Sequence, residues 1–245
     1  MIPAIIHLPE TGSTNSAAIE LLSKERPGEG SVIITDHQTD GRGIDTNKWE
    51  SEKGMNLTFS LILYPTFNAG QQFILNKAIS LGIYDFLVAG LPGQKVSIKW
   101  PNDIYIGDKK ACGILIQNSV IGNRFDYVVV GIGLNVNQTL FISNAPNPVS
   151  LKMITGKDYN LEELLQQLLR SVTKRYRQVK PESIHEIEND YQFALYRRME
   201  WHDYLLKDVN VPARITGTSA YGQLLLETRT NQIVVCNLKE VKFIL

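Results

Sequence analysis

The sequence predicts an α+β protein: a mixed, largely antiparallel sheet flanked by helices, followed by a small C-terminal β-barrel. Three observations indicate this class. Apolar, β-branched runs alternate with helical patterns up to residue 196, the dipeptide Gly122-Asn123 suits a hairpin turn between two such runs, and short strand-like segments follow. We therefore expect a large domain over residues 1–197 and a small β domain over residues 198–245.

The first part of the chain alternates strands, one helix and a polar loop. Residues 4–7 and 31–35 are apolar or β-branched, and we expect them to be strands. Residues 15–22 carry apolar residues at helical spacing, with Ser13-Thr14-Asn15 as candidate caps. The stretch 36–48 is polar, contains glycine and has no periodicity, so we expect a loop.

The rest of the chain supplies more strands and three helices. Short apolar runs bounded by turn residues predict strands over 57–63, 96–100, 113–117 and 127–131. Apolar stripes at helical spacing predict helices over 71–87, from Asn160 to Tyr176, and over 181–196. Asn160, with Glu163 three positions later, is typical of a helix start. Short strands are then predicted over 209–216, 223–227, 233–236 and 241–245.

The composition is that of an ordinary globular protein, with 43% hydrophobic and 20% charged residues. Lys plus Arg and Asp plus Glu number 25 each, so the net charge of zero gives no general attraction to nucleic acid. The apolar start, Met1 to Ile6, lacks the basic residues and the length of a signal peptide, so we expect a cytoplasmic protein that does not bind membranes. Cys112 and Cys236 stand far apart without metal-ligand spacing, which indicates neither a disulfide scaffold nor a zinc site.

Gly41-Arg42-Gly43 lies in the polar loop just after a predicted strand. Its glycines let backbone amides approach a ligand closely, and Arg42 can bind a carboxylate or a phosphate. Taken alone, the tripeptide is better explained as a surface turn with a solvated arginine. Gln38 three positions before it and Trp49 six positions after it add to the pattern.

Lys99-Trp100-Pro101-Asn102-Asp103 places a cation, a rigid break and an amide–carboxylate pair at one strand end. The simpler reading makes Asn102-Asp103 a plain turn and Trp100 a core residue, and a core tryptophan is compatible with function. Lys110 stands seven residues after Asp103 and begins the pattern Lys110-x-x-Gly113. A lysine in a hairpin turn would ordinarily be solvated.

Two further motifs are ambiguous by themselves. Gly131-Ile132-Gly133-Leu134-Asn135 is not a dinucleotide-binding GxGxxG, because Val136 replaces the third glycine and the following stretch is a poor helix. The sequence also lacks a Walker GxxxxGK[ST] motif. Ser13-Thr14-Asn15 offers two hydroxyls and an amide to a polar ring, although a simple helix cap explains these residues nearly as well.

In their order along the chain, the five motifs resemble those of biotin protein ligases over residues 11–136, and the rest of the chain resembles that family in arrangement only. The resemblance implies a catalytic domain of the class II synthetase and biotin ligase type with an SH3-like C-terminal domain. It implies that biotin attacks ATP to form biotinyl-5'-AMP, and that a lysine of a biotin carboxyl carrier domain then takes the biotin. Biotin and ATP would be substrates, with Mg²⁺ accompanying the nucleotide.

The resemblance also implies a role for individual residues. Those implied for biotin are Ser13, Thr14, Asn15, Gln38, Gly41, Arg42, Lys110, Gly113 and Gly131. Those implied for ATP or the adenylate are Arg42, Gly43, Ile44, Trp49, Lys99, Asn102, Lys110 and Asn135. Arg42, Lys99 and Lys110 would offset negative charge in both steps, and Asp103 would orient or deprotonate the acceptor amine. No metal ligand is implied.

One position departs from the family's pattern. Many members carry a second arginine directly after Gly-Arg-Gly, where this chain has Ile44, followed by Asp45 and Thr46. The isoleucine side chain carries no charge and cannot hydrogen-bond, so one cation expected beside the adenylate is missing. We therefore expect weaker retention of the intermediate.

Three alternatives remain at this stage. A lipoate or octanoate ligase of related fold would lack the pairing of Gly-Arg-Gly with the Lys-Trp-Pro-Asn-Asp motif. A biotin-responsive repressor would need a helix-turn-helix before the motifs, and these begin at Ser13, so we expect the monofunctional type. A catalytically weak biotin-binding protein is compatible with Ile44. The sequence does not distinguish a monomer from a homodimer.

Overall fold

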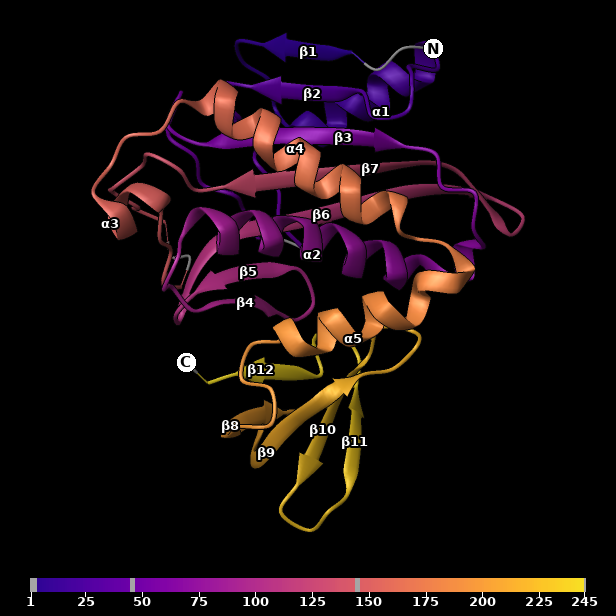
Figure 1. Cartoon of the computed structure of the whole chain (residues 1–245), viewed down its shortest axis with the longest axis vertical. Helices are drawn as coiled ribbons and strands as arrows, with labels where there is room; N and C mark the ends of the chain where they lie inside the picture. Colours follow the sequence, from indigo (N-terminus) through magenta and orange to yellow (C-terminus); the bar gives the residue numbers. More distant parts are fainter. Residues whose placement is uncertain (1–3, 45–46, 144–145, 245) are drawn as a thin grey trace.

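The computed structural model describes residues 4–44, 47–143 and 146–244, and these form two sheets and their covering helices (Figure 1). The larger sheet contains β1 (Ile5–Leu8), β2 (Val32–Thr35), β3 (Leu57–Leu63), β4 (Val96–Lys99), β5 (Asp103–Ile106), β6 (Lys109–Ile121) and β7 (Arg124–Leu134). The smaller sheet contains β8 (Trp201–Leu206), β9 (Val209–Thr218), β10 (Leu224–Thr228), β11 (Ile233–Cys236) and β12 (Val241–Phe243). The α-helices are α1 (Thr14–Lys24), α2 (Gln72–Gly90), α3 (Leu151–Thr155), α4 (Leu161–Arg177) and α5 (Ile184–Ala194).

The larger sheet runs in the order β1-β2-β3-β7-β6-β5-β4. The pair β1 and β2 is parallel, and the other neighbouring strands of this sheet pair antiparallel. The smaller sheet runs in the order β11-β10-β9-β8-β12, with antiparallel pairs. The predicted α+β class, with a mixed and largely antiparallel sheet and a second β unit at the C-terminal end, is therefore confirmed.

Helices cover both faces of the larger sheet. In Figure 1, α2 and α4 lie in front of the sheet and α1 lies behind it. The buried side chains divide accordingly: Val130 belongs to the cluster under α2 and α4, whereas Val129 packs with Ala18 of α1. Because successive residues of a strand point to opposite faces, Gly131 and Gly133 share the α1 face with Val129.

Most predicted elements are present. Helix α4 begins after Asn160, whose side chain accepts hydrogen bonds from the amides of Glu162 and Glu163, and α2 and α5 lie where helices were predicted. The hairpin between β6 and β7 turns at Gly122, which has a positive φ of 61° that glycine adopts without strain.

Three elements were not predicted: β5, β8 and α3. Strand β5 begins within the Lys99–Asp103 motif, so the polar residues of the motif concealed it. In strand β8, the polar residues His202 and Asp203 interrupt the apolar pattern. Helix α3 has five residues and depends on local caps, because Ser150 Oγ accepts from the amide of Met153 and Gly156 ends the helix in the left-handed region.

Helix α2 is the central core helix of the fold. With the turn before it, it spans Ala69–Gly90 at a mean hydropathy of 1.4, which by length and composition alone would also suit a membrane-spanning helix. However, 61% of that window is buried inside the protein, between the larger sheet, α4 and α5. Its hydropathy is therefore explained by the core that it fills.

The two sheets meet at the Trp100 side chain. Its Nε1 donates to the carbonyl of Gly222, in the turn between β9 and β10, at 2.8 Å. Gly222 has a φ of 85°, and a Cβ there would overlap the ring of Phe73. The expected domain boundary between residues 197 and 198 lies between the end of α5 and the start of β8, and it stays a prediction.

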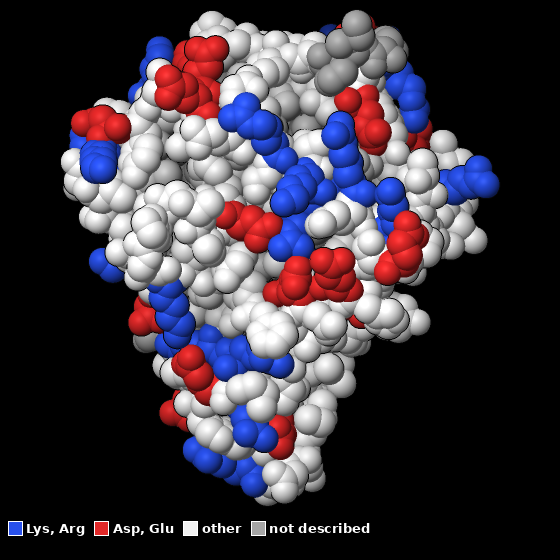
Figure 2. All heavy atoms as spheres, viewed as in Figure 1, with Lys and Arg blue, Asp and Glu red and all other residues white. Residues whose placement is uncertain are grey.

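Charged side chains of both signs are intermingled over the face that carries α2 and α4 (Figure 2). This distribution agrees with the formal net charge of zero. On this face of the molecule, the charges therefore form small local pairs and clusters of mixed sign.

An ion-pair cluster around Arg175 joins helices α2, α4 and α5. Its guanidinium contacts Asp85 of α2 and Asp190 of α5, each at 2.6 Å, and the hydrogen bond that it donates to Asp85 is the main cause of a raised pKa for Arg175. Arg175→Met is expected to lower the free energy of unfolding by about 1.5–3 kcal/mol, because two partly buried carboxylates lose their partner. Urea unfolding would measure this, with Arg177→Met on the exposed side of α4 as the control, and equal stability of the two variants would contradict it.

Candidate active site

A pocket opens on the α1 face of the larger sheet, where Gly113, Gly131 and Gly133 leave the strands without side chains. The start of α1 and the loop after β2 form its other walls. From the residues predicted for the site, the pocket brings together Ser13, Thr14, Asn15, Gln38, Arg42, Gly43, Ile44, Trp49, Asn102, Asp103, Lys110, Gly113 and Gly131. Gly41, Lys99 and Asn135 are not among its lining residues.

The start of α1 contributes a buried polar floor. Ser13 is the residue before the helix, but the structure gives its side chain no capping hydrogen bond among the described residues. Thr14 instead interacts with Gln38, whose Oε1 accepts from the Thr14 amide at 2.9 Å and from its hydroxyl at 3.2 Å. A simple helix cap therefore does not explain the side chains of this motif.

Asn15 is fixed by contacts on two strands of the sheet. Its Nδ2 donates to Gln117 Oε1 at 2.8 Å and to the carbonyl of Leu115 at 3.2 Å. The hydroxyl of Ser60, on β3, lies 2.6 Å from Asn15 Oδ1 and 2.8 Å from Thr14 Oγ1. These buried side chains hold donors and acceptors in fixed directions at one end of the pocket.

The loop after β2 folds over the pocket through Gly41 and Trp49. The Trp49 amide donates to the Gly41 carbonyl at 2.9 Å, and a Cβ on Gly41 would overlap the Trp49 carbonyl oxygen. Gly41 therefore supports the loop from behind rather than lining the pocket. Arg42 lies at the mouth, where its Nε and Nη2 donate to Asp40 at 3.2 and 3.1 Å.

The Trp49 ring lies against Gly113 and Gly133 of the sheet. A Cβ on Gly133 would overlap the indole, and a Cβ on Gly113 would lie 3.0 Å from its Cζ3 atom. The indole Nε1 is buried and has no hydrogen-bond partner among the described residues. The glycines of β6 and β7 therefore create the space that a flat ring occupies on this face.

Lys110 and Asp103 form an ion pair inside the pocket. Lys110 Nζ lies 2.7 Å from Asp103 Oδ1, with side-chain exposures of 27% and 16%. The ammonium group also lies 5.7 Å from the centre of the Trp49 ring. Since Asp103 pairs across the strands with Gly113, the bare glycine gives the lysine side chain room to fold over the sheet.

Lys99 lies behind this pair, towards the C-terminal sheet. Its Nζ is 4.7 Å from the ring centre of Phe243 on β12 and 5.3 Å from that of Tyr105. Burial lowers the pKa of Lys99, an effect that Asp103 opposes and that Lys110 and Arg197 reinforce. The predicted cation is therefore near the site, but enclosed by aromatic rings.

Asn135, which was predicted to bind ATP or the adenylate, does not line the pocket. Its side chain is 3% exposed and its Nδ2 donates to the carbonyls of Val149 and Lys110, at 3.2 and 3.4 Å. It thus lies behind the strand that carries Lys110.

The structure adds residues that were not predicted as site residues: Asn47, Lys48, Ile114, Leu115, Ile132 and Gly133 in the lining, and Ser60 and Gln117 in the floor. Ser60 could have been suspected, because it and Thr58 are polar residues in an otherwise apolar run. Lys48 is a second loop cation at the pocket, close in sequence to the position where the family often has arginine.

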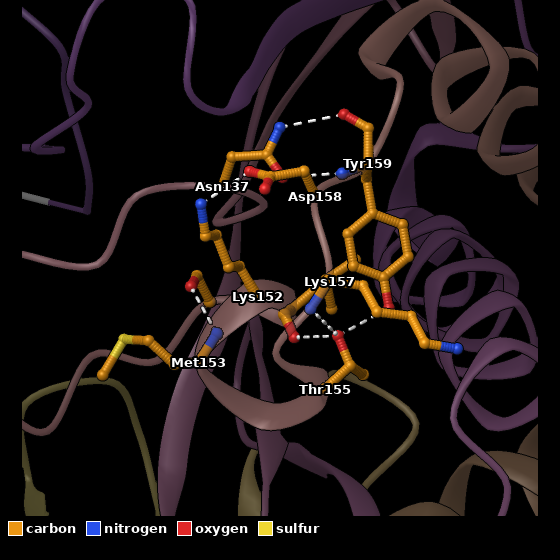
Figure 3. Close-up of polar contacts among 9 residues, drawn as sticks. Asn137, Lys152, Met153, Thr155, Lys157, Asp158 and Tyr159 are labelled. Carbon is orange, nitrogen blue, oxygen red and sulfur yellow. Dashed lines mark hydrogen bonds and ion pairs between the residues drawn. The ribbon is translucent and has the colours of Figure 1, made fainter.

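The chain after β7 is secured by a cluster of polar contacts (Figure 3). Asn137 Nδ2 donates to the Tyr159 carbonyl and its Oδ1 accepts from the Tyr159 amide, both at 2.9 Å. Lys152 and Asp158 form an ion pair of 2.6 Å beside this clamp. The cluster holds in place the segment that passes alongside Lys110.

Ile44 borders two hollows. It lines the pocket and also a neighbouring groove that includes Pro101 and Tyr221. The second arginine of the family would therefore lie at the mouth of the pocket. Asp45 and Thr46 lie outside the described residues.

Ile44→Arg is expected to slow escape of a bound adenylate, because a cation at the mouth would attract its phosphate. The dissociation rate of pre-formed biotinyl-adenylate would be measured, with Ile44→Met as an uncharged control. An unchanged rate would remove this role from position 44.

Comparisons with known proteins agree with this geometry. The sequence profile described as the biotin/lipoate A/B protein ligase family matches residues 8–135. The biotin--[acetyl-CoA-carboxylase] ligase of Paracoccus denitrificans is 34% identical over 66% of this chain and 68% of its own length. The bifunctional ligase/repressor BirA of Bacillus subtilis is 31% identical over 90% of this chain, which spans 66% of that relative.

Solved structures resemble the whole fold. The biotin protein ligase from Aquifex aeolicus in complex with biotin and ATP superposes with a TM-score of 0.79 at 28% identity, covering 98% of both chains. The profile match covers more than half of this chain and includes the five motifs that meet at the pocket. This chain belongs to the biotin/lipoate A/B protein ligase family.

Proposed function

We propose that this protein is a biotin protein ligase, which activates biotin with ATP to biotinyl-5'-AMP and transfers biotin to a lysine of a biotin carboxyl carrier domain. The observation that carries the proposal is the polar floor of Thr14, Asn15 and Ser60 at one end of a glycine-lined pocket that also contains a lysine. A ureido ring needs donors and acceptors in fixed directions, and a carboxylate at the other end of the same ligand needs a cation.

The first step is the activation of biotin by ATP. Of the cations predicted for the site, Lys110 and Arg42 line the pocket. They would stabilise negative charge on the biotin carboxylate and the α-phosphate as the oxygen–phosphorus bond forms and pyrophosphate leaves. Asp103 forms an ion pair with Lys110, and Asp40 forms one with Arg42. A bound anion would compete with those carboxylates for the same cations.

For the second step, Asp103 is the residue that we assign to the acceptor amine. Among the described residues that line the pocket, it carries the only carboxylate. It lies 2.7 Å from Lys110, so it could accept a proton from, or orient, an amine that enters beside that lysine. The amine would attack the adenylate carbonyl carbon and AMP would leave.

Mg²⁺ would enter with the nucleotide, as part of the substrate, and would neutralise charge on its phosphates. Asp103 is the pocket carboxylate available to such a complex, and its donor type suits a hard cation.

A lipoate or octanoate ligase is the second candidate. A saturated acyl chain has no donor or acceptor for the polar side chains of Ser13, Thr14 and Asn15, which line this end of the pocket. The polar floor favours biotin for this reason, since unsatisfied polar groups weaken binding of an apolar chain. The cytoplasmic location and the carrier-domain partner remain part of the proposal.

The deciding experiment measures pyrophosphate release from ATP with biotin, lipoate or octanoate in turn, followed by mass spectrometry of a carrier domain. Biotin-dependent release and a single biotinyl adduct on the carrier lysine are expected. Release with lipoate alone would move the protein to the sister activity, and tight biotin binding without release would make it a binding protein.

A further inference from the structure

The loop between β2 and β3 forms a short antiparallel ribbon beside the pocket. Two backbone hydrogen bonds define this ribbon. The Trp49 amide donates to the Gly41 carbonyl at 2.9 Å, and the Gly43 amide donates to the Asn47 carbonyl at 2.8 Å. The two residues between these bonds form a non-hydrogen-bonded pair, the kind of pair in which opposite side chains lie closest. The ribbon thus fixes the spacing of the two side chains that this pair carries.

That pair consists of Arg42 and Lys48. Opposite residues of an antiparallel pair project to the same side of the ribbon, and both of these side chains line the pocket. Like charges that lie directly opposite each other are destabilising. The ribbon therefore holds two cations together at a cost in stability, and an anion bound between them would offset this cost.

The cations of the pocket differ in their partners. Arg42 donates from Nε and Nη2 to Asp40 at 3.2 and 3.1 Å. Lys110 pairs with Asp103, the one lining carboxylate among the described residues. Lys48 is exposed at the pocket, and its ammonium group has no ion pair within residues 4–44, 47–143 and 146–244. Of the three lining cations, Lys48 is therefore the one that no carboxylate neutralises.

The position of the ribbon indicates which anion it would bind. The polar floor around Asn15 lies at one end of the pocket, and the ribbon with Arg42 lies at the mouth. In biotinyl-5'-AMP, the phosphate follows the carboxyl group, at the end of the chain remote from the ring. With the ring on the floor, the phosphate would lie towards the ribbon. Ile44, which belongs to the same loop, supplies no charge there.

We propose that Arg42 and Lys48 form a clamp for the phosphate of the activated intermediate, in which Lys48 supplies the charge that Ile44 does not. The inference rests on the proposed ligase function, because that function places an adenylate in this pocket. A phosphate between two cations accepts charge-assisted hydrogen bonds from both, and these are stronger than hydrogen bonds between neutral groups. The clamp would retain the intermediate until the acceptor amine arrives.

Lys48→Met is expected to release pre-formed biotinyl-5'-AMP roughly 5- to 20-fold faster than the wild type, because one charge-assisted contact is lost. Lys48→Arg keeps the charge and should stay within about twofold of the wild type. Lys53→Met is the matched control, since Lys53 is an exposed lysine of the same loop that does not line the pocket. The dissociation rate would be measured by displacement with excess biotin. The affinity for biotin alone should be unchanged in all three variants, because biotin carries no phosphate.

Equal release rates for Lys48→Met and Lys53→Met would overturn the proposal. Equal losses of affinity for biotin and for biotinyl-5'-AMP would also overturn it, because they would indicate a disturbed loop and not a lost phosphate contact. A raised KM for ATP with unchanged release of the adenylate would assign Lys48 to the phosphates that leave, against the proposal.

The unfolding temperature without ligand provides a readout that separates the clamp from a structural role. Lys48→Met should be at least as stable as the wild type, because two like charges no longer lie opposite each other. A lowered unfolding temperature would contradict the clamp. If the wild type releases no pyrophosphate with biotin and ATP, the proposed function fails, and this failure is distinct because the clamp is tested with pre-formed adenylate.

Discussion

Lys110→Ala is expected to reduce biotin-dependent pyrophosphate release by about 100- to 1,000-fold, the typical effect of removing one fixed charge-stabilising group from an active site. Lys110 is the cation that lies deepest against the glycine-lined face, 2.7 Å from Asp103 and 5.7 Å from the Trp49 ring centre. Its loss would leave the developing charge on the α-phosphate without its nearest fixed partner.

The neighbouring residue provides the control for this variant. Lys109 is exposed and does not line the pocket, so Lys109→Ala removes an equal charge one position away and should leave the rate within about twofold. Steady-state release of pyrophosphate at saturating ATP and biotin measures both. A near-wild-type rate for Lys110→Ala would remove this lysine from the mechanism.

Gly131→Ala is expected to weaken biotin binding roughly 5- to 150-fold, which corresponds to about 1–3 kcal/mol of overpacking. A Cβ at this position would overlap Oδ1 of Asn15 and would displace the amide from Ser60 and Gln117. The effect should appear in the affinity for biotin alone, because the polar floor is independent of the nucleotide.

Gly90→Ala is the matched control for Gly131→Ala. Gly90 ends α2, and a Cβ there would meet no atom within 4 Å. Calorimetric titration with biotin would compare the two variants with the wild type. Unchanged affinity for Gly131→Ala would show that Asn15 does not contribute to the biotin site.

The strength of a local signal decided which elements could be predicted. Helix α4 has a cap at Asn160 and a regular apolar stripe, and the β6–β7 hairpin has a glycine at the required positive φ, so neighbouring residues suffice to specify both. Strand β5 has only four residues and begins two residues after Pro101, and its pairing with β6 rather than its own sequence defines it. Short elements of this kind depend on contacts with distant residues.

The residues of the candidate site that belong to a recognisable motif could be predicted from the sequence. Thirteen residues converge on one pocket as the resemblance implied, from Ser13 to Gly131. The contribution of Ser60 was not predicted, because its relation to Asn15 depends on the packing of α1 over β3. Residues 45 apart in sequence become partners only when the sheet and helix are assembled.

The sequence by itself determined the α+β class, the main helices and the motifs that carry the family. The tertiary structure alone decided the directions of side chains around those motifs. Asn135 faces the backbone of Lys110, Lys99 lies under Phe243, and a bulge in β6 at Ala111 turns Lys110 into the pocket. The physical reason is that one additional residue in a strand reverses which face a side chain occupies, and that residue is defined only by pairing between strands.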